Sequence, residues 1–121
     1  MQGSTIFIFD DDQDILLMCG IVLKQQGYTV ATSDVCDDIV NRVSTVNPDV
    51  VIMDNKIPPY GGISATKTLK GDPSTKNIPV LFFSANTQVE QLSREAGADA
   101  YIQKPFNLDE FEKAISDLVN K

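Results

Sequence analysis

The chain has 121 residues, of which 42% are hydrophobic, and this length and composition suit one compact domain with its own core. Its formal net charge of −7 argues against nucleic-acid binding, which requires a basic surface, and is compatible with a bound cation or a basic partner. The sequence contains no apolar run long enough to span a membrane, no signal segment, and no histidine that could serve as a general base, metal ligand or phosphohistidine.

Short apolar runs alternate with helical patterns along the whole chain. In chain order, strands are predicted at residues 5–9, 28–32, 49–53, 79–83 and 100–102. A helical pattern follows each strand, with apolar residues spaced along 15–23, 36–43, 63–69, 89–96 and 108–118. The third strand is apolar without alternation, which is typical of a strand covered on both faces of a parallel sheet. Strict alternation of this kind predicts a (βα)5 α/β fold with a parallel sheet and right-handed crossovers.

Polar residues and a glycine mark the ends of the first two predicted helices. Asp12 is the expected N-cap of the first helix, where its side chain would accept hydrogen bonds from backbone N–H groups. Gly27 stands where that helix should end. Ser33 or Asp34 is the expected N-cap of the second helix.

Chemically compatible side chains follow four of the five predicted strands. The first strand is followed by Asp10, Asp11 and Asp12, the third by Asp54, the fourth by Ser84 and the fifth by Lys104. Two carboxylates about 4 Å apart repel by roughly 4 kcal/mol even at an effective dielectric near 20, so water, a cation or a function must offset the cost. Each residue alone has an ordinary interpretation as a cap or a solvated side chain. Ligands of open parallel sheets bind outside the carboxyl ends of the strands. The placement of all these polar residues at that one edge therefore predicts a single site.

Four segments carry a family resemblance: IFIFDDDQDI at 6–15, PDVVIMDNKIPPYGG at 48–62, IPVLFFSA at 78–85 and GADAYIQKPF at 97–106. With them the chain resembles a response-regulator receiver domain of bacterial two-component signalling over essentially its whole length. The resemblance implies a single receiver domain at 1–121 with no output domain. It also implies a flavodoxin-like, doubly wound sheet of five parallel strands in the order 2-1-3-4-5, the strand order that chemotaxis receivers also have.

The resemblance further implies the residues of a phosphorylation site. Asp54 corresponds to the phosphoacceptor. The Mg²⁺ ligands correspond to Asp10, Asp11, Asp54 and the backbone carbonyl of Lys56, with Asp11 expected to contact the ion directly and Mn²⁺ as a possible substitute. Lys104 would pair with a phosphoryl oxygen, and its bond to Pro105 resembles the family's cis peptide.

The resemblance also implies how a signal would leave the site. Ser84 stands at the switch hydroxyl and would move toward the phosphoryl group, which frees space for the switch aromatic Tyr101. Lys56 and Asn86 stand at the two positions that tune the phosphoryl lifetime. The expected output face comprises the fourth helix, the fifth strand and the fifth helix, around Gln88, Gln91, Glu95, Tyr101 and Gln103. The loop at 57–62 (IPPYGG) departs from the usual family pattern, which affects kinase docking rather than the chemistry.

The expected function is therefore that of a phosphorelay receiver, which catalyses only its own phosphorylation and dephosphorylation. Its partners would be a sensor histidine kinase or a histidine phosphotransfer domain and a downstream protein that the sequence does not identify, without nucleic acid or membrane. A cytoplasmic monomer or weak phosphorylation-dependent dimer is expected, in which Cys19 and Cys36 are reduced core residues. Two alternatives stay open: a haloacid-dehalogenase-like phosphatase, whose nucleophile lies in an Asp-x-Asp after the first strand, and a docking module that is never phosphorylated.

Overall fold

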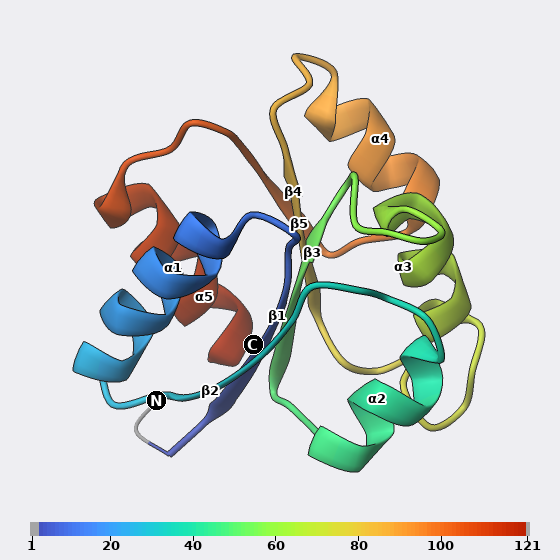
Figure 1. Cartoon of the computed structure of the whole chain (residues 1–121), viewed down its shortest axis with the longest axis horizontal. Coiled ribbons are helices and arrows are strands. Elements are labelled where there is room, and N and C mark those ends of the chain that lie inside the picture. The colour runs from blue at the N-terminus through green and yellow to red at the C-terminus, as the bar shows by residue number, and fades with distance from the viewer. Residues whose placement is uncertain (1–2, 121) are drawn as a thin grey trace.

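Residues 3–120, which the computed structural model describes, form five strands and five helices in strict alternation (Figure 1). The strands are β1 (Thr5–Phe9), β2 (Thr29–Ser33), β3 (Val50–Asp54), β4 (Val80–Ser84) and β5 (Ala100–Gln103). The helices are α1 (Gln13–Gln25), α2 (Ile39–Val46), α3 (Gly62–Lys70), α4 (Val89–Ala96) and α5 (Leu108–Val119). The predicted alternation is confirmed.

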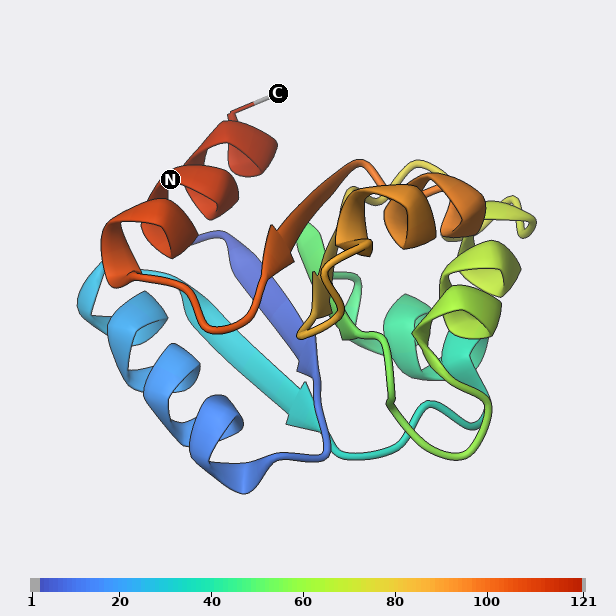
Figure 2. The same ribbon diagram turned by 90° about the horizontal axis from the view of Figure 1, so that it is seen from above.

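The strands form one parallel sheet in the order β2-β1-β3-β4-β5, as expected from the resemblance. Helices α1 and α5 cover one face of the sheet, and α2, α3 and α4 cover the other, so the molecule has three layers (Figures 1 and 2). Every residue of β3 and β4 is buried, as a strand enclosed on both faces requires. Each large apolar side chain buried in this way stabilises the fold by about 1.5–3 kcal/mol.

Two main apolar clusters lie on the two faces of the sheet. The cluster under α1 and α5 includes an aromatic group in which Phe83 lies 5.1 Å from Phe106 and 5.9 Å from Phe111 between ring centroids. The cluster under α2 and α3 includes the stacked rings of Phe7 and Phe9, 4.3 Å apart. Phe9 is the last residue of β1 and Phe83 the penultimate residue of β4, so these rings pack near the carboxyl edge of the sheet, where the candidate site lies.

The two cysteines are free and fully buried, as their apolar spacing predicted. Cys19 packs in the cluster under α1 and α5, and Cys36 packs in the cluster under α2 and α3.

None of the helices within residues 3–120 combines the length and the apolar character needed to cross a membrane.

The predicted start of the second helix is wrong. Neither Ser33 nor Asp34 caps it, because α2 begins only at Ile39, after Asp38 in a left-handed conformation (φ 53°). The Ser33 hydroxyl instead donates to the carbonyl of Val35, 2.7 Å away, and forms a local turn directly after β2. Cys36, expected within the helix, precedes it.

Candidate functional site

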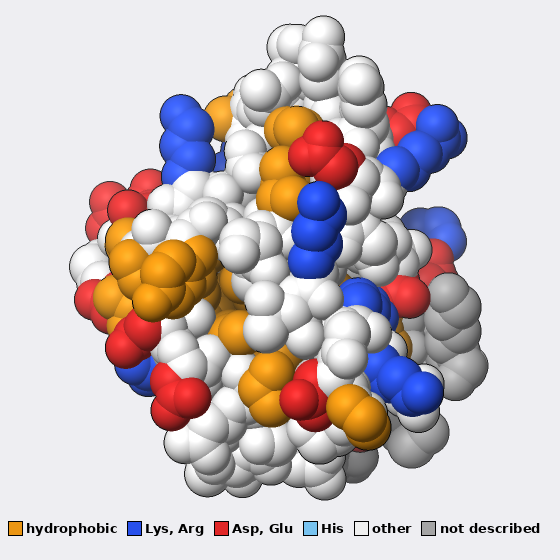
Figure 3. Space-filling view, turned by 90° about the vertical axis from the view of Figure 1, so that its right-hand side faces the viewer, with side chains coloured by type: hydrophobic (Ala, Val, Ile, Leu, Met, Phe, Trp, Pro, Cys, Tyr) orange, Lys and Arg blue, Asp and Glu red, His pale blue; other side chains and the backbone are white. Residues whose placement is uncertain are grey.

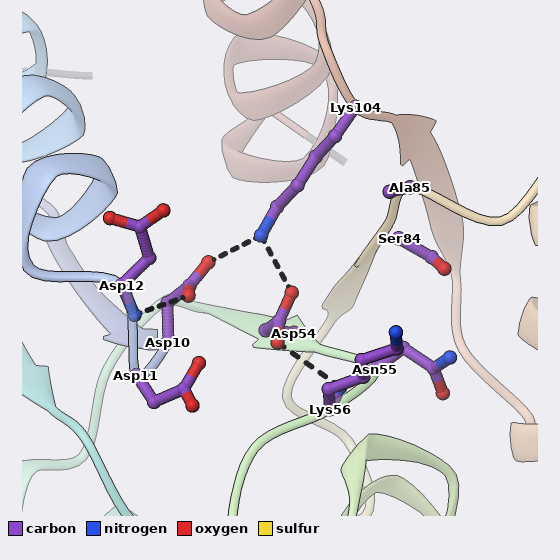
Figure 4. Close-up of a pocket in the computed structure, with 9 residues that line it drawn as sticks. All are labelled: Asp10, Asp11, Asp12, Asp54, Asn55, Lys56, Ser84, Ala85 and Lys104. Atoms are coloured by element: carbon purple, nitrogen blue, oxygen red, sulfur yellow. Dashed lines mark hydrogen bonds and ion pairs between the residues drawn. The ribbon is translucent and has the colours of Figure 1, made fainter.

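The candidate site lies at the carboxyl edge of the sheet, where four strands deliver polar side chains into one cavity (Figure 4). Asp54 and Ser84 are the last residues of β3 and β4, while Asp10 and Lys104 directly follow β1 and β5. The cavity has a volume of about 230 Å³ and is lined by Asp10, Asp11, Asp12, Asp54, Asn55, Lys56, Ser84, Ala85 and Lys104. The structure therefore brings together the polar strand-end residues that the sequence singled out.

Three carboxylates converge in this cavity. Asp10 is 1% exposed and Asp54 is 6% exposed, whereas Asp11 is open to solvent. One oxygen from each lies within 4.8 Å of the others. Backbone N–H groups orient the two buried carboxylates, because Asp12 donates to Asp10 Oδ1 at 2.9 Å and Lys56 donates to Asp54 Oδ2 at 3.1 Å.

Lys104 connects the two buried carboxylates. Its Nζ lies 2.8 Å from Asp10 Oδ2 and 2.7 Å from Asp54 Oδ1 (Figure 4). Burial raises the pKa of Asp10, and the charge of Asp54 adds to this, against the opposing hydrogen bonds from Lys104 and the Asp12 backbone. Burial alone would lower the pKa of Lys104, but its hydrogen bonds to both carboxylates and their charges outweigh burial and raise it. The ammonium thus stays charged and neutralises part of the acidic cluster.

The donor set fits a small divalent cation. Mg²⁺ prefers oxygen ligands and is commonly held by one or two carboxylates together with water and phosphate oxygens. Two of the three converging carboxylates are withdrawn from solvent, and the third, on Asp11, is accessible at the mouth of the cavity. The Lys104 ammonium compensates only part of the repulsion among the three carboxylates, and such a cation would compensate the rest.

Asp12 is the helix cap that the sequence predicted. Its side chain accepts hydrogen bonds from the backbone N–H groups of Asp14 at 2.9 Å and Ile15 at 3.3 Å, at the start of α1. This carboxylate points away from Asp54 in Figure 4, although it lines the cavity. Asp12 therefore serves the fold, and the acidic pair of the site is formed by Asp10 and Asp11.

Ser84 lines the cavity, but its hydroxyl points away from the buried carboxylates (Figure 4). The hydroxyl oxygen accepts a hydrogen bond from the backbone N–H of Asn86 at 3.0 Å. Tyr101 lies on the neighbouring β5 and is 44% exposed, with its side chain on the surface. The switch roles expected of Ser84 and Tyr101 stay predictions.

The other expected residues lie near the site or on the expected output face. Lys56 and Asn86 are both exposed, and the Lys104–Pro105 peptide bond is cis. Pro58–Pro59 is a second cis bond, which the sequence did not predict. The expected face on α4 and β5 is exposed at each of Gln88, Gln91, Glu95, Tyr101 and Gln103.

Two residues of the site were not assigned from the sequence. Asn55 lines the cavity, and its position directly after the acceptor candidate was an available signal. Gly62 opens α3 against the end of β3, and a Cβ atom there would lie 2.3 Å from the carbonyl oxygen of Asp54. Only glycine allows this approach, and the paired glycines at 61 and 62 were the available signal.

Comparisons with known proteins agree with this geometry. The family model described as the response regulator receiver domain matches residues 6–116. The response regulator protein GraR of Staphylococcus saprophyticus is 36% identical over 104 residues, which cover 84% of this chain and 45% of that protein. The phosphate regulon transcriptional regulatory protein PhoB of Escherichia coli is 32% identical over 122 aligned positions, covering 99% of this chain and 53% of that protein. The chain thus spans about half the length of these curated relatives.

A solved structure shows the same fold. The crystal structure of a putative response regulator from Chloroflexus aurantiacus superposes with a TM-score of 0.92 at 26% sequence identity. The match covers 99% of this chain and 100% of that one. None of these similarities supports a haloacid-dehalogenase-like phosphatase or a docking module that is never phosphorylated.

Proposed function

We propose that this chain, which belongs to the family of response regulator receiver domains, takes a phosphoryl group onto the carboxylate of Asp54. One observation carries the proposal: a buried aspartate at the end of a central strand shares an ammonium with a second buried aspartate inside a small open cavity. A merely structural ion pair would not need a cavity beside it. The family as a whole acts in two-component signalling.

The chemistry assigned to Asp54 is nucleophilic attack on phosphorus. A carboxylate oxygen forms the new O–P bond, the P–N bond of a donor phosphohistidine breaks, and the donor imidazole leaves with the electron pair. Asp54 Oδ2 is held by the Lys56 N–H and Oδ1 by Lys104, so the nucleophile is oriented before the donor arrives. After the transfer, the Lys104 ammonium can form an ion pair with a negatively charged phosphoryl oxygen.

The metal belongs to the same proposal. Asp10, Asp11, Asp54 and the backbone carbonyl of Lys56 would hold Mg²⁺, or Mn²⁺ in its place, which supplies charge neutralisation for the phosphoryl oxygens. Ala85 is small and lines the cavity, which keeps the approach to Asp54 open. The chain would catalyse only its own phosphorylation and, through water, its own dephosphorylation.

Signal output would follow from a shift between two states that exist before phosphorylation. The Ser84 hydroxyl would turn from the Asn86 backbone toward the phosphoryl group, and Tyr101 would fill the space it leaves. The output face on α4, β5 and α5 would thereby change for a downstream protein. Lys56 lines the cavity, and Asn86 follows the cavity residue Ala85 in sequence. Both residues are exposed and would set the access of water and so the phosphoryl lifetime.

The donor would be a sensor histidine kinase or a histidine phosphotransfer domain, since the chain has no histidine of its own. The family and the two free, buried cysteines favour a cytoplasmic setting, as a monomer or a weak phosphorylation-dependent dimer. The phosphatase alternative is weakened by Asp12, because the second aspartate of its Asp-x-Asp is engaged as the cap of α1.

Intact-mass measurement tests the proposal. The protein is incubated with phosphoramidate, with Mg²⁺ or with EDTA, and weighed. We expect one added phosphate that requires Mg²⁺, is absent in Asp54→Asn, and is retained in the control Asp117→Asn, whose carboxylate lies on the surface of α5. Steady release of inorganic phosphate that depends on Asp10 but not on Asp54 would favour the phosphatase. No gain of mass in any condition would favour a docking module.

A further inference from the structure

The outer face of α1 carries two exposed apolar side chains between two opposite charges. Leu17 is 65% exposed and Ile21 is 50% exposed, although both lie within the helix. Asp14 lies in the first turn of α1 and Lys24 in the last turn, and both are exposed. Successive members of this set are three or four residues apart, so the four side chains lie along one line of the helix surface. These four residues are named the α1 stripe below.

The α1 stripe is open to a partner. The opposite side of the helix packs on the sheet, and its buried residues are Leu16, Cys19, Gly20, Val22 and Leu23. Figures 1 and 2 show α1 beside α5, on the outside of the sheet. Within residues 3–120, neither Asp14 nor Lys24 takes part in an ion pair. The two residues are also about 15 Å apart along the helix axis, which is too far for them to pair with each other.

A mostly apolar groove extends this surface toward the loop between β5 and α5. Its volume is about 380 Å³, and it is lined by Ile15, Met18, Ala85, Lys104, Pro105 and Phe106. Met18 is 40% exposed and lies three residues before Ile21, so the two side chains are neighbours on the helix surface. The apolar area that α1 offers to a partner is therefore larger than the stripe alone.

The α1 stripe is complementary to itself in the antiparallel direction. Leu17 and Ile21 lie two residues before and after Cys19, and Asp14 and Lys24 lie five residues before and after it. A twofold axis through the middle of the helix would therefore place Leu17 against Ile21 of a second copy. The same axis would place Asp14 against Lys24 of that copy, and each contact would occur twice. In a parallel pair, each of these charges would instead meet its own kind and be repelled.

A second copy fits the α1 stripe better than it fits another exposed apolar surface. On the face formed by α2, α3 and α4, apolar side chains gather at one edge with acidic side chains around them (Figure 3). Two copies joined there would bring like charges together, and each chain has a net charge of −7. The α1 stripe carries one charge of each sign, so antiparallel pairing adds attraction. Salt at about 0.15 M screens the repulsion between the remaining charges beyond about 8 Å.

We propose that the partner of the α1 stripe is a second copy of this chain, bound as an antiparallel helix pair about a twofold axis. No member of the stripe lines the acceptor cavity, so the inference does not rest on the proposed function and the pairing requires no phosphorylation. It is distinct from a phosphorylation-dependent dimer for the same reason. One helix of each chain supplies the core of the contact, so the interface should be smaller than the roughly 1,600 Å² of a standard stable complex, and the dimer should be weak.

Sedimentation velocity tests the proposal on unphosphorylated protein in EDTA, at about 0.15 M salt and at concentrations up to about 1 mM, which populate weak complexes. Wild type is compared with Ile21→Ala, Asp14→Lys and Lys24→Asp. Two controls, Asp117→Lys and Lys113→Asp, make the same changes of charge on α5, where the two side chains are 64% and 77% exposed. A general effect of net charge would appear equally in these controls.

We expect Ile21→Ala to weaken self-association about tenfold, because its apolar contact is lost twice in a symmetric pair. Asp14→Lys and Lys24→Asp should each weaken it about tenfold, because two attractive pairs become repulsive. A mixture of these two charge variants should recover the affinity of wild type, because every basic side chain of one chain then faces an acidic one of the other. This recovery also shows that both variants are folded. The α5 controls and Asp54→Asn should associate as wild type does.

Several outcomes would overturn the inference. A wild-type chain that stays monomeric at about 1 mM would leave the α1 stripe to a different protein. A dimer that the α1 variants do not weaken would lie on another face, and charge variants whose mixture does not recover would exclude the antiparallel register. A dimer that forms only after phosphorylation, or that Asp54→Asn loses, would also contradict the proposal. Failure of phosphoramidate to phosphorylate wild type, measured separately, would count against the proposed function alone.

Discussion

Lys104→Met removes the ammonium group that lies between two buried carboxylates. The Lys104 side chain is 19% exposed, and those of Asp10 and Asp54 are 1% and 8% exposed. Their oxygens lie within 4.8 Å of each other, so the unshielded charges would repel by about 3 kcal/mol at an effective dielectric near 20. Removing one partner of a buried pair typically costs about 3–5 kcal/mol. We expect the metal-free variant to lose about 3 kcal/mol of its free energy of unfolding at pH 7.

Urea unfolding in EDTA measures this loss, with Lys113→Met as the matched control. Lys113 pairs with Asp117 at the surface, where the two side chains are 77% and 64% exposed, so its loss should change stability little. Mg²⁺ should restore most of the stability of Lys104→Met, because a cation that binds only the folded state can neutralise the same carboxylates. Equal losses for the two variants, or equal stabilisation of wild type and Lys104→Met by Mg²⁺, would refute the reasoning.

The pH dependence supplies a second check on the same variant. The hydrogen bond from Lys104 lowers the pKa of Asp10 and so offsets part of the increase that burial causes. Without this hydrogen bond, the pKa of Asp10 should rise further in Lys104→Met. A carboxyl group with a higher pKa in the folded state binds its proton more tightly there, so acidification through that pKa favours the fold. The stability difference between wild type and variant should therefore narrow as the pH falls from neutral. The pKa of Lys104 is itself raised above 10.5. Wild type should therefore keep the stabilisation from the charged Lys104 ammonium at lower pH and lose it as the pH rises through the raised pKa.

Three further predictions follow from single contacts. Gly62→Ala should slow phosphorylation by phosphoramidate, because the new Cβ atom would lie 2.3 Å from the carbonyl oxygen of Asp54. The control Gly20→Ala should leave the rate unchanged, because its new Cβ atom would have no heavy atom of another segment within 4 Å. Thr66→Val should raise the free energy of unfolding in urea by about 1 kcal/mol, since its buried hydroxyl has no hydrogen-bond partner. Cys19 should resist iodoacetamide at pH 8 until urea unfolds the chain, because burial raises the pKa of its thiol to about 12, and rapid labelling of the folded protein would contradict this.

The order and type of the elements could be predicted because they depend on local patterns. The apolar run before Asp10 and the run before Asp54 identify central strands by composition alone. The ends of β3 and β4 lie one residue later than predicted, so Asp54 and Ser84 belong to their strands rather than to the following loops. This matters for the site, because the strand ladder fixes the backbone of both residues.

The start of α2 could not be predicted, because a contact between distant segments decides it. Cys36 has the apolar spacing of a helical residue and is buried as that spacing requires. Its backbone N–H, however, donates to the carbonyl of Pro58 in the loop after β3 rather than within a helix. The helix can begin only after this bond and the left-handed turn at Asp38. The burial of Cys36 could thus be predicted from the sequence, whereas the hydrogen bond from its backbone to Pro58 could not.

Charge balance explains the one feature of the site that could not be predicted from the sequence, which is the pairing of Lys104 with both Asp10 and Asp54. Asp10, Asp11 and Asp54 with one ammonium leave the site with a formal excess of two negative charges. A phosphoryl group on Asp54 replaces one negative charge with nearly two, so it would be strongly opposed unless a divalent cation bound beside it. Lys104 can partly neutralise the resting site, but it cannot balance the phosphorylated one. The convergence of the three carboxylates therefore supports the proposed cation site, and Lys104 holds two of them together.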